Sequence, residues 1–452
     1  MKALIIAAGD GTRMQPVTRG RHKSLMELLG LKIIERVILG AKEAGINEFV
    51  IVTGYKGDDL RETVGDGSRY GVLIKYVHNP KWEKANGISV FCAKRYFNEN
   101  FVLLMSDHVF NPKTLLKIQR LKLKDKECAL AIDRKLESVL DVADTTKVTA
   151  KNGQVVSIGK KLGKYNAYDT GMFILSPYIF EVLKATTGVG KNSLTNAMAV
   201  VASQGKLRTF DIKSKFWADC DTWADIKFAE KKLLASLVKA KDGIVSKRFN
   251  RKVSTLITRF LVKTPVTPNL ISFSILGLAI LTFLFLAKGT YPWIFLGGLL
   301  IQFMSIVDGC DGEVARLKFI KSKWGAWLDP ILDRYVDTVI IAGMAYGYWS
   351  VTGNKLILPI AAFVMLAMML EDYMPNKFRI EIGKKLKLNA PDFKRDIRSL
   401  LLSLGALTNQ ILASFLIFLL FSQYRAIARL IAGKRISEEV SGTSQIATSN
   451  RT

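Results

Sequence analysis

Cysteine and histidine are both scarce in this chain of 452 residues, which contains four cysteines and three histidines. Cys92, Cys128, Cys220 and Cys310 show neither the paired spacing of a zinc site nor a disulfide framework. This absence argues against a disulfide-stabilised secreted domain and suits a reducing compartment. We expect the four cysteines to be small, buried, apolar side chains.

The first half of the chain lacks long apolar runs, because these begin only after Pro265. Residues 1–6 enter a glycine-rich turn too early for a secretory signal, so we expect a soluble domain that stays in the cytoplasm. No recognised nucleic-acid motif accompanies the net charge of +27. Much of that charge borders the later apolar runs, where it would attract phosphorylated substrates and anionic membrane lipid.

Hydropathy predicts an all-α membrane domain with six transmembrane helices. The expected spans are 269–287, 292–312, 325–348, 353–372, 391–407 and 409–431. Residues 399–424 could instead form one continuous helix, but a single crossing would leave Arg425 and Arg429 outside, whereas two crossings keep them in the cytoplasm. We therefore expect a multi-pass protein of the cell membrane with the N-terminal domain and the C-terminus in the cytoplasm.

Four aspartates, Asp308, Asp311, Asp329 and Asp333, lie within or between the second and third expected spans. Carboxylates are costly at membrane depth, and spacings of three and four residues put each pair on one face of its helix. Two helices can therefore direct all four toward one point, where a hard ion such as Mg²⁺ or Mn²⁺ would bind. The alternative is that they cap helices or pair with nearby arginine and lysine side chains.

The spacing of these aspartates resembles the signature of the CDP-alcohol phosphotransferases. The string is Asp308-x-x-Asp311-Gly312-x-x-Ala315-Arg316, then eight residues, then Gly325-x-x-x-Asp329-x-x-x-Asp333. The resemblance implies six spans, a homodimer formed through the membrane domain, and a reaction in which an alcohol displaces CMP with the help of two metal ions. All four aspartates would be metal ligands, and Asp333 would also take the proton from the attacking hydroxyl. Gly312 and Ala315 would line the nucleotide site, and Arg316 would pair with its phosphates.

Basic residues flank the expected membrane helices. Lys394, Arg395 and Arg398 could hold a phosphate of the second substrate, or could act only as cytoplasmic anchors. Residues 246–263 have the pattern of a basic amphipathic helix in the membrane interface, with packing of its apolar face against protein as the alternative. Residues 267–269 resemble the segment at the start of the family's first span.

Short β-rich runs alternate with amphipathic helical stretches in the first half. The expected strands are 3–7, 48–53, 72–77, 101–106 and 127–132, and a helix is expected over 31–44. This alternation predicts a doubly wound α/β domain with a mostly parallel sheet. Ligands in such sheets bind beyond the carboxyl ends of the strands.

The turn after the first expected strand resembles the phosphate-binding loop of the sugar-phosphate nucleotidyltransferases. Its residues are Ala7, Ala8, Gly9, Asp10, Gly11, Thr12 and Arg13. The glycines allow backbone N–H groups to approach phosphate, and Arg13 adds charge. Lys23 follows at the distance typical of that family, although His22 and Ser24 stand where it usually has prolines. Asp107, at the end of an apolar strand, would bind a metal ion, or could simply cap a helix or turn.

Two later segments narrow the expected substrate. Residues 86–89 resemble the cytidylyltransferases that act on choline phosphate or inositol phosphate, with Asn86 and Ser89 near the nucleotide. Residues 169–171 and 217–222 resemble the family's substrate segment and its second metal site. Asp219 is the preferred metal ligand there, and Asp221 remains an alternative ligand. Asp221 could instead, with Thr222, cap a helix over 223–238.

The first reaction expected from this resemblance depends on positioning and charge. A phosphate oxygen of the acceptor attacks the α-phosphorus of CTP, while Mg²⁺, Arg13 and Lys23 compensate the charge of the leaving pyrophosphate. The acceptor phosphate is already ionised at pH 7, so no protein nucleophile or general base is required. His22 and His108 therefore receive no catalytic role.

Together the two resemblances predict four parts in the chain. These are a cytidylyltransferase domain over 1–240, a linker with the interfacial helix over 241–266, a CDP-alcohol phosphotransferase domain over 267–433 and a polar tail over 434–452. The order resembles a family of archaeal bifunctional enzymes that make a precursor of a compatible solute. The resemblance implies that CTP and inositol 1-phosphate give CDP-inositol and pyrophosphate. CDP-inositol and a second inositol 1-phosphate would then give di-myo-inositol phosphate phosphate and CMP.

Two alternatives share the same residues. In the first, the cytidylyltransferase is fused to a phosphotransferase that makes a phospholipid, and the metal ligands are identical in both cases. In the second, the soluble half is a nucleotide sensor and the membrane half an anchor or transporter. The intact set of charged site residues argues against the sensor.

Overall fold

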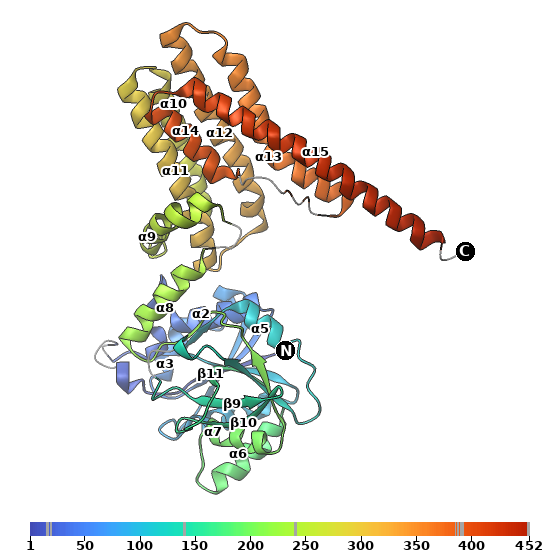
Figure 1. Cartoon of the computed structure of the whole chain (residues 1–452). Coiled ribbons are helices and arrows are strands. Elements are labelled where there is room, and N and C mark those ends of the chain that lie inside the picture. Colours follow the sequence, from blue (N-terminus) through green and yellow to red (C-terminus); the bar gives the residue numbers. More distant parts are fainter. Residues whose placement is uncertain are drawn as a thin grey trace. The chain divides into compact units, whose positions relative to one another are not determined.

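The computed structural model describes residues 1–14, 18, 20–138, 142–238, 242–384, 386, 388 and 393–449 (Figure 1). The chain divides into two compact units, Met1–Ser236 and Leu237–Thr452. In the described part, Cys128, Cys220 and Cys310 are buried, Cys92 is half-buried, and all four are free thiols. This confirms the expectation that cysteine forms no disulfide framework here.

A large sheet is the centre of the first unit. Its strands are β1 (Ala3–Ala7), β4 (Glu48–Thr53), β5 (Leu73–His78), β6 (Phe101–Met105), β8 (Cys128–Asp133), β9 (Lys147–Lys151), β10 (Gln154–Gly159), β11 (Ala167–Leu175) and β12 (Leu207–Asp211). Their order across the sheet is β5-β4-β1-β6-β11-β8-β12-β10-β9. The five expected strands are all present, each within one residue of its predicted ends.

The sheet is mixed, so the prediction of a mostly parallel sheet was wrong for its second half. Strands β5, β4, β1 and β6 run parallel, and β12 runs parallel to β8. Strand β11 is antiparallel to both β6 and β8. Strands β9 and β10 form a hairpin closed by Asn152 and Gly153, which both have positive φ. A hairpin needs no crossover helix, so antiparallel strands occur in the part of the chain where few helices separate the strands.

Helices cover both faces of the sheet, as the doubly wound prediction requires. They are α2 (Ile33–Glu43), α3 (Gly57–Val64), α4 (Asn86–Cys92), α5 (Pro112–Ile118), α6 (Tyr178–Gly188), α7 (Leu194–Ser203) and α8 (Trp223–Ser236). Successive residues of β1 point to opposite faces. Leu4 and Ile6 join a hydrophobic cluster that includes Leu183 of α6, whereas Ala3 and Ile5 join another with α2.

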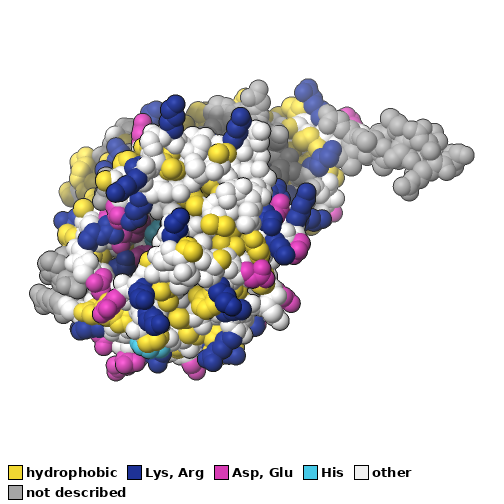
Figure 2. Space-filling view, turned by 90° about the horizontal axis from the view of Figure 1, so that it is seen from below, with side chains coloured by type: hydrophobic (Ala, Val, Ile, Leu, Met, Phe, Trp, Pro, Cys, Tyr) yellow, Lys and Arg dark blue, Asp and Glu magenta, His cyan; other side chains and the backbone are white. Residues whose placement is uncertain are grey.

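Two short ribbons lie outside the large sheet. Strand β2 (Glu27–Leu28) pairs with β3 (Leu31–Lys32), so the helix expected over 31–44 begins two residues later than predicted. Strand β7 (His108–Phe110) pairs with β13 (Trp217–Asp219). On the face seen in Figure 2, Lys and Arg side chains are spread out among Asp, Glu and apolar side chains. The positive charge is therefore not gathered into one basic patch on that face.

The second unit is helical. Its elements are the π-helical turn η6 (Ser246–Asn250), α9 (Arg251–Leu261), α10 (Pro268–Ala287), α11 (Tyr291–Leu317), α12 (Lys323–Thr352), α13 (Ile357–Ile382), α14 (Arg395–Leu407) and α15 (Ile411–Ser449). Each expected span coincides with one of α10 to α15. The predicted polar tail begins within α15.

Four of the described helices are long and apolar enough to cross a membrane, namely α10, α11, α13 and α15. Helix α12 has 30 residues, but no stretch of it is apolar enough to be counted among them. Helix α14 has only 13 residues. Length and composition therefore support a membrane protein with four candidate spans. The two remaining helices, α12 and α14, carry Asp329, Asp333 and the basic candidates Arg395 and Arg398.

The amphipathic segment before the first span uses its polar side for packing. Ser254 and Thr258 of α9 are completely buried. The apolar residues Phe249, Leu256 and Phe260 are 55%, 58% and 69% exposed within the described structure. The apolar face thus stays open, as a helix lying in a membrane interface requires.

Candidate active sites

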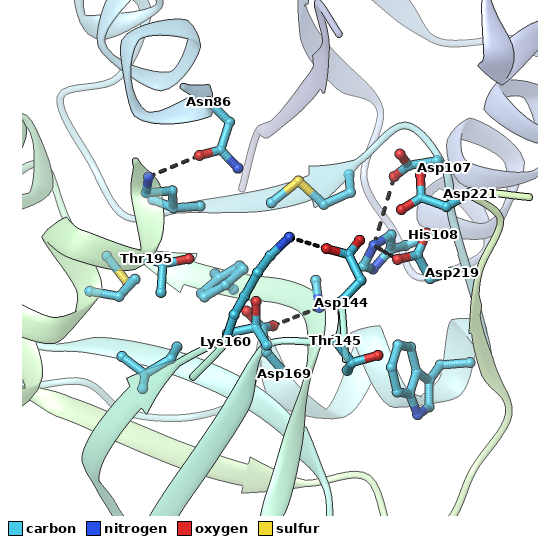
Figure 3. Close-up of a pocket in the computed structure, with 18 of the residues that line it drawn as sticks. Asn86, Asp107, His108, Asp144, Thr145, Lys160, Asp169, Thr195, Asp219 and Asp221 are labelled. Atoms are coloured by element: carbon cyan, nitrogen blue, oxygen red, sulfur yellow. Dashed lines mark hydrogen bonds and ion pairs between the residues drawn. The ribbon is translucent and has the colours of Figure 1, made fainter. Parts of the chain in front are cut away.

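The ribbon of β7 and β13 brings two aspartates and a histidine together. Asp107 directly precedes β7, and the antiparallel pairing sets His108 opposite Asp219. One ligand atom of each of the three lies within 4.8 Å of the others. His108 Nε2 is 3.4 Å from Asp219 Oδ2 and 3.8 Å from Asp107 Oδ1 (Figure 3). The structure therefore joins the predicted pair Asp107 and Asp219, and it adds His108.

The charges of this cluster fit a divalent cation. Burial raises the pKa of Asp219, and the carboxylates of Asp107 and Asp221 add to the effect against the opposing charge of His108. Its Oδ1 atom is buried and accepts no hydrogen bond from any residue that the structure describes. Carboxylate oxygens crowded in this way are the ligands that Mg²⁺ and Mn²⁺ prefer.

Two cationic side chains lie beside the cluster. Lys23 Nζ contacts Asp107 and is 2.7 Å from Asp221 Oδ1. Burial works to lower the pKa of Lys23, but the two carboxylates outweigh it and raise the pKa above its usual range. Arg13 Nη1 is 2.5 Å from Asp144 Oδ2, and Nη2 contacts Asp221. Both side chains therefore carry the positive charge that the prediction assigned to them.

Asp219 and Asp221 have different partners. Asp219 faces Asp107 and His108, whereas Asp221 forms ion pairs with Arg13 and Lys23. Asp221 does not cap the following helix, because Thr222 Oγ1 accepts the hydrogen bond from the backbone N–H of Asp225 at 3.2 Å. The contacts therefore favour Asp219 as the second metal ligand.

His22 and Gly11 position the turn at Lys23 next to the predicted phosphate-binding loop. His22 Nδ1 accepts a 3.2 Å hydrogen bond from the Ser24 N–H, so Nε2 carries the proton and donates to the carbonyl of Ala7 at 3.1 Å. Gly11 has φ +60°, and a Cβ there would lie 2.9 Å from the Cβ of Lys23. The turn at Lys23 is thus tied to the end of β1 by a histidine where the family usually has proline.

A cavity of about 210 Å³ opens beside the acidic cluster. The predicted residues Arg13, Asn86, Asp107 and Asp219 line it, together with the predicted substrate residues Asp169 and Gly171. The loop residues Ala7, Ala8, Gly9, Gly11 and Thr12 do not line it. Ser89 is 2% exposed, accepts a hydrogen bond from Asn79 and does not line the cavity.

Several cavity residues were not predicted. Asp144, Lys160 and Thr195 point into the same space as Asp169 (Figure 3). Lys160 Nζ is 2.5 Å from Asp144 Oδ1. Burial raises the pKa of Asp169 to about 6, although the Gly171 N–H and His108 oppose the rise. Lys160 directly follows β10, a strand that was not recognised in the sequence, and no motif pointed to Asp144, Lys160 or Thr195.

The second site lies in the helical unit, where α11 and α12 face each other. Ligand oxygens of Asp308, Asp329 and Asp333 lie within 4.8 Å of one another. Asp311 is not part of this group of three. The carboxylates of Asp329 and Asp308 are close enough to interact with it electrostatically, and its Oδ2 accepts a 3.0 Å hydrogen bond from Ser272. Three of the four predicted carboxylates thus gather at one point, with Asp311 beside them, and the donor set fits a hard divalent ion.

Arg395 compensates this negative charge. Its Nη1 atom is 2.7 Å from Asp308 Oδ2 and 2.9 Å from Asp333 Oδ1. Arg398 is buried at 3% exposure and lies 3.5 Å from Asp372. Lys394 is exposed and lines a cavity of about 230 Å³ that also contains Asp308 and Arg395. Two of the three basic candidates therefore border the acidic site, and Arg398 belongs to a neighbouring ion pair.

Arg316 is available for an anion. Its Nε and Nη2 atoms are buried and find no hydrogen-bond partner among the described residues. A Cβ at Gly312 would lie 3.0 Å from Arg316 Nη1, so the glycine leaves room for the guanidinium. An unpaired buried guanidinium is costly, and a phosphate would satisfy it. Ala315 lies one residue before Arg316 on α11.

Two family matches cover most of the chain. Residues 2–236 match the family described as nucleotidyl transferase, and residues 265–433 match the family described as CDP-alcohol phosphatidyltransferase. These ranges contain the two sites described above.

Similar proteins come from bacteria and archaea. A bifunctional IPC transferase and DIPP synthase of Rubrobacter xylanophilus is 33% identical over 96% of this chain and 96% of its own length. The protein of the same name from Thermococcus kodakarensis is 32% identical over 96% of this chain and 98% of its own length. A solved structure, the inositol-1-phosphate CTP transferase from T. maritima, is 25% identical with a TM-score of 0.46, covering 51% of this chain and 95% of that chain.

Proposed function

The chain belongs to the family of bifunctional IPC transferases and DIPP synthases, and from that premise we propose that it carries out two consecutive reactions. The first unit transfers CMP from CTP to inositol 1-phosphate and releases pyrophosphate. The second unit joins CDP-inositol to another inositol 1-phosphate and releases CMP. The observation that carries the proposal is that one chain contains two separate acidic clusters, each beside cationic side chains suited to phosphate.

In the first reaction the protein positions charge. The ionised phosphate of inositol 1-phosphate attacks the α-phosphorus of CTP, and the bond to the β-phosphate breaks. Arg13 and Lys23 leave their carboxylate partners to compensate the pyrophosphate. Asn86 and Ser89 stay assigned to the nucleotide region, with Asn86 at the cavity wall and Ser89 buried on the same helix, α4.

In the second reaction a hydroxyl of the acceptor attacks the inositol-bearing β-phosphorus of CDP-inositol, and Asp333 takes the proton of that hydroxyl. The new phosphorus–oxygen bond forms as the bond from the β-phosphorus to the bridging oxygen breaks, and CMP leaves with that oxygen. Arg316 binds the phosphates of the nucleotide through its unpaired guanidinium nitrogens, next to Gly312 and Ala315. Arg395 turns from Asp308 and Asp333 to the phosphate of the acceptor, assisted by Lys394. Arg398 holds α14 against α13 through Asp372 and the backbone of Met368.

Divalent cations are required at both clusters. When bound, Mg²⁺ or Mn²⁺ supplies charge that stabilises the attacking and leaving oxygens. Asp107 and Asp219 hold it in the first unit, and Asp308, Asp311, Asp329 and Asp333 hold a pair of ions in the second.

The membrane arrangement follows from the distribution of charge. We place the six helices α10 to α15 across the membrane, with α14 and the polar start of α12 facing a water-filled cavity rather than lipid. Lys and Arg at the ends of the helices put the first unit and the C-terminus in the cytoplasm. The exposed apolar face of α9 lies on anionic lipid, and the membrane unit forms a homodimer.

A direct test uses the purified full-length protein in detergent with CTP, Mg²⁺ and inositol 1-phosphate, followed by ³¹P NMR. We expect pyrophosphate, CMP and a water-soluble phosphodiester to form without any lipid substrate. If a lipid were required for CMP release, the enzyme would instead be a phospholipid synthase fused to a cytidylyltransferase. Binding of CTP without turnover by either unit would favour the sensor.

A further inference from the structure

His108 has no part in the reaction proposed above, yet its ring lies between the two aspartates of the first site (Figure 3). Its Nδ1 atom is 3.0 Å from the carbonyl oxygen of Thr170. A carbonyl can only accept, so Nδ1 carries a proton and donates it. The other nitrogen, Nε2, faces Asp107 and Asp219.

The backbone makes space for the ring in this orientation. Gly171 has φ +73°, and a Cβ there would lie 2.1 Å from His108 Nδ1. Any other residue at this position would expel the ring from the cluster. The ring is therefore positioned both by a hydrogen bond and by the absence of a side chain. Histidines that bind metal ions characteristically donate their second N–H to a carbonyl or carboxylate in this way.

The distances around Nε2 match those around one cation. Two ligand atoms, each about 2.1 Å from an ion, are about 3.0 Å apart at a right angle and about 4.2 Å apart on opposite sides. The distances of 3.4 Å to Asp219 Oδ2 and 3.8 Å to Asp107 Oδ1 lie within this interval. The unpaired Oδ1 atom of Asp219 offers a further oxygen.

We propose that His108 Nε2 is the third protein ligand, beside Asp107 and Asp219, of the cation in the nucleotidyl-transfer site. The proposal deepens the function proposed for the first unit and rests on it. An imidazole nitrogen shifts the preference of the site toward Mn²⁺ and Co²⁺, because these ions bind nitrogen more strongly than Mg²⁺ does. The all-carboxylate site of the membrane unit lacks that preference.

The test is pulsed EPR of Mn²⁺ bound to the full-length protein in detergent, without nucleotide. We expect a ¹⁴N coupling typical of a metal-bound imidazole. The coupling should disappear in His108→Asn, whose shorter amide can still donate to the Thr170 carbonyl but has no atom at the place of Nε2. His78→Gln is the matched control, because His78 is an exposed residue on β5 and its replacement should leave the coupling unchanged.

Metal affinity gives a second readout. In His108→Asn we expect the dissociation constant for Mn²⁺ at the first site to rise about tenfold or more, and that for Mg²⁺ to rise much less. Formation of diester from supplied CDP-inositol should persist, because the second unit is separate. An unchanged circular-dichroism spectrum of the variant would show that the first unit is folded.

Wild-type Mn²⁺ with oxygen ligands only would overturn the proposal, and would mean that His108 is an imidazolium paired with the two aspartates. A coupling that survives in His108→Asn would overturn it as well. Normal pyrophosphate release without a nitrogen coupling would leave the proposed function intact. A nitrogen coupling in a protein that releases no pyrophosphate from CTP and inositol 1-phosphate would overturn that function and support the ligand assignment.

Discussion

Arg251 donates a hydrogen bond of 2.6 Å to the carboxylate of Glu313, which is completely buried. Ser254 and Thr258 donate to the same carboxylate, each at 2.7 Å. These contacts fasten α9 to α11 beside the residues that hold the second site. A Cβ at Gly309 would lie 2.6 Å from Arg251 Nη1, so the contact between α9 and α11 depends on the glycine. The helix before the first span therefore supports the helix that carries Asp308 and Asp311.

Replacing Glu313 with Ala should weaken the contact between α9 and α11. Removing one partner of a buried ion pair costs about 3–5 kcal/mol when the other charge is left alone. The loss should be smaller here, because Arg251 keeps its 2.9 Å ion pair with Asp242. We expect Glu313→Ala to lower the thermal midpoint of the second unit in detergent and to reduce diester formation. Pyrophosphate release should remain, since the first unit is separate. Diester formation at the wild-type rate with an unchanged midpoint would show that the contact has no positioning role.

Asp107→Ala should stop the first reaction selectively. Loss of a ligand to the cation removes several kcal/mol of charge stabilisation, so pyrophosphate release should fall about 100-fold or more. Diester formation from supplied CDP-inositol and inositol 1-phosphate should continue. Asp125, an exposed aspartate in a turn, provides the control Asp125→Ala. Equal loss in both variants would contradict the assignment.

His22 should make the first unit sensitive to acid. Burial and the charge of Lys23 lower its pKa from 6.5 to about 4. Below pH 6.5 His22 binds a proton in the unfolded chain but stays neutral in the folded chain. The full free energy of unfolding is therefore present above pH 6.5, and it falls by about 3 kcal/mol toward pH 4. Calorimetry of the full-length protein should show this slope, and His22→Gln should flatten it. An identical slope in the variant would assign the acid sensitivity to other groups.

The positions of side chains on a single helix could be predicted, because helical geometry converts residue spacing directly into a direction around the helix axis. Three of the four membrane aspartates, Asp308, Asp329 and Asp333, come together, since spacings of three and four residues define a helix face. Buried parallel strands such as β1 and β4 were found within one residue, because continuous apolar runs mark them.

Contacts between distant segments could not be predicted in the same way. His108 and Asp219 meet because β7 pairs with β13, more than a hundred residues later. Strands β9 to β12 were missed, although the Asn152-Gly153 dipeptide is a strong hairpin signal that would have revealed β9 and β10. Lys160 directly follows β10 and was missed with it, whereas Asp169 of β11 was found only through its resemblance to the family's substrate segment.

Asp333→Asn should separate the two reactions in the opposite direction from Asp107→Ala. The amide cannot accept a proton, and general-base catalysis contributes about 10²- to 10⁴-fold. We expect diester formation to fall by that factor, with CDP-inositol accumulating as pyrophosphate is released. Both products can be followed in one sample by ³¹P NMR, so the first reaction is the internal control. Normal diester formation would remove Asp333 from the role of base.

Arg395→Gln should test whether the basic start of α14 binds substrate or only anchors the helix. Arg395 lies on Asp308 and Asp333, where its charge competes with a divalent ion. Its removal should therefore tighten Mn²⁺ binding at the second site. The KM for inositol 1-phosphate in diester formation should rise about tenfold or more, since a hydrogen bond to a charged group contributes about 1.5–3 kcal/mol. Arg248→Gln, at an exposed basic residue of η6, removes the same charge away from the aspartates and is the matched control. An anchoring role would give the same small effect in both variants, whereas a phosphate ligand changes KM in Arg395→Gln alone.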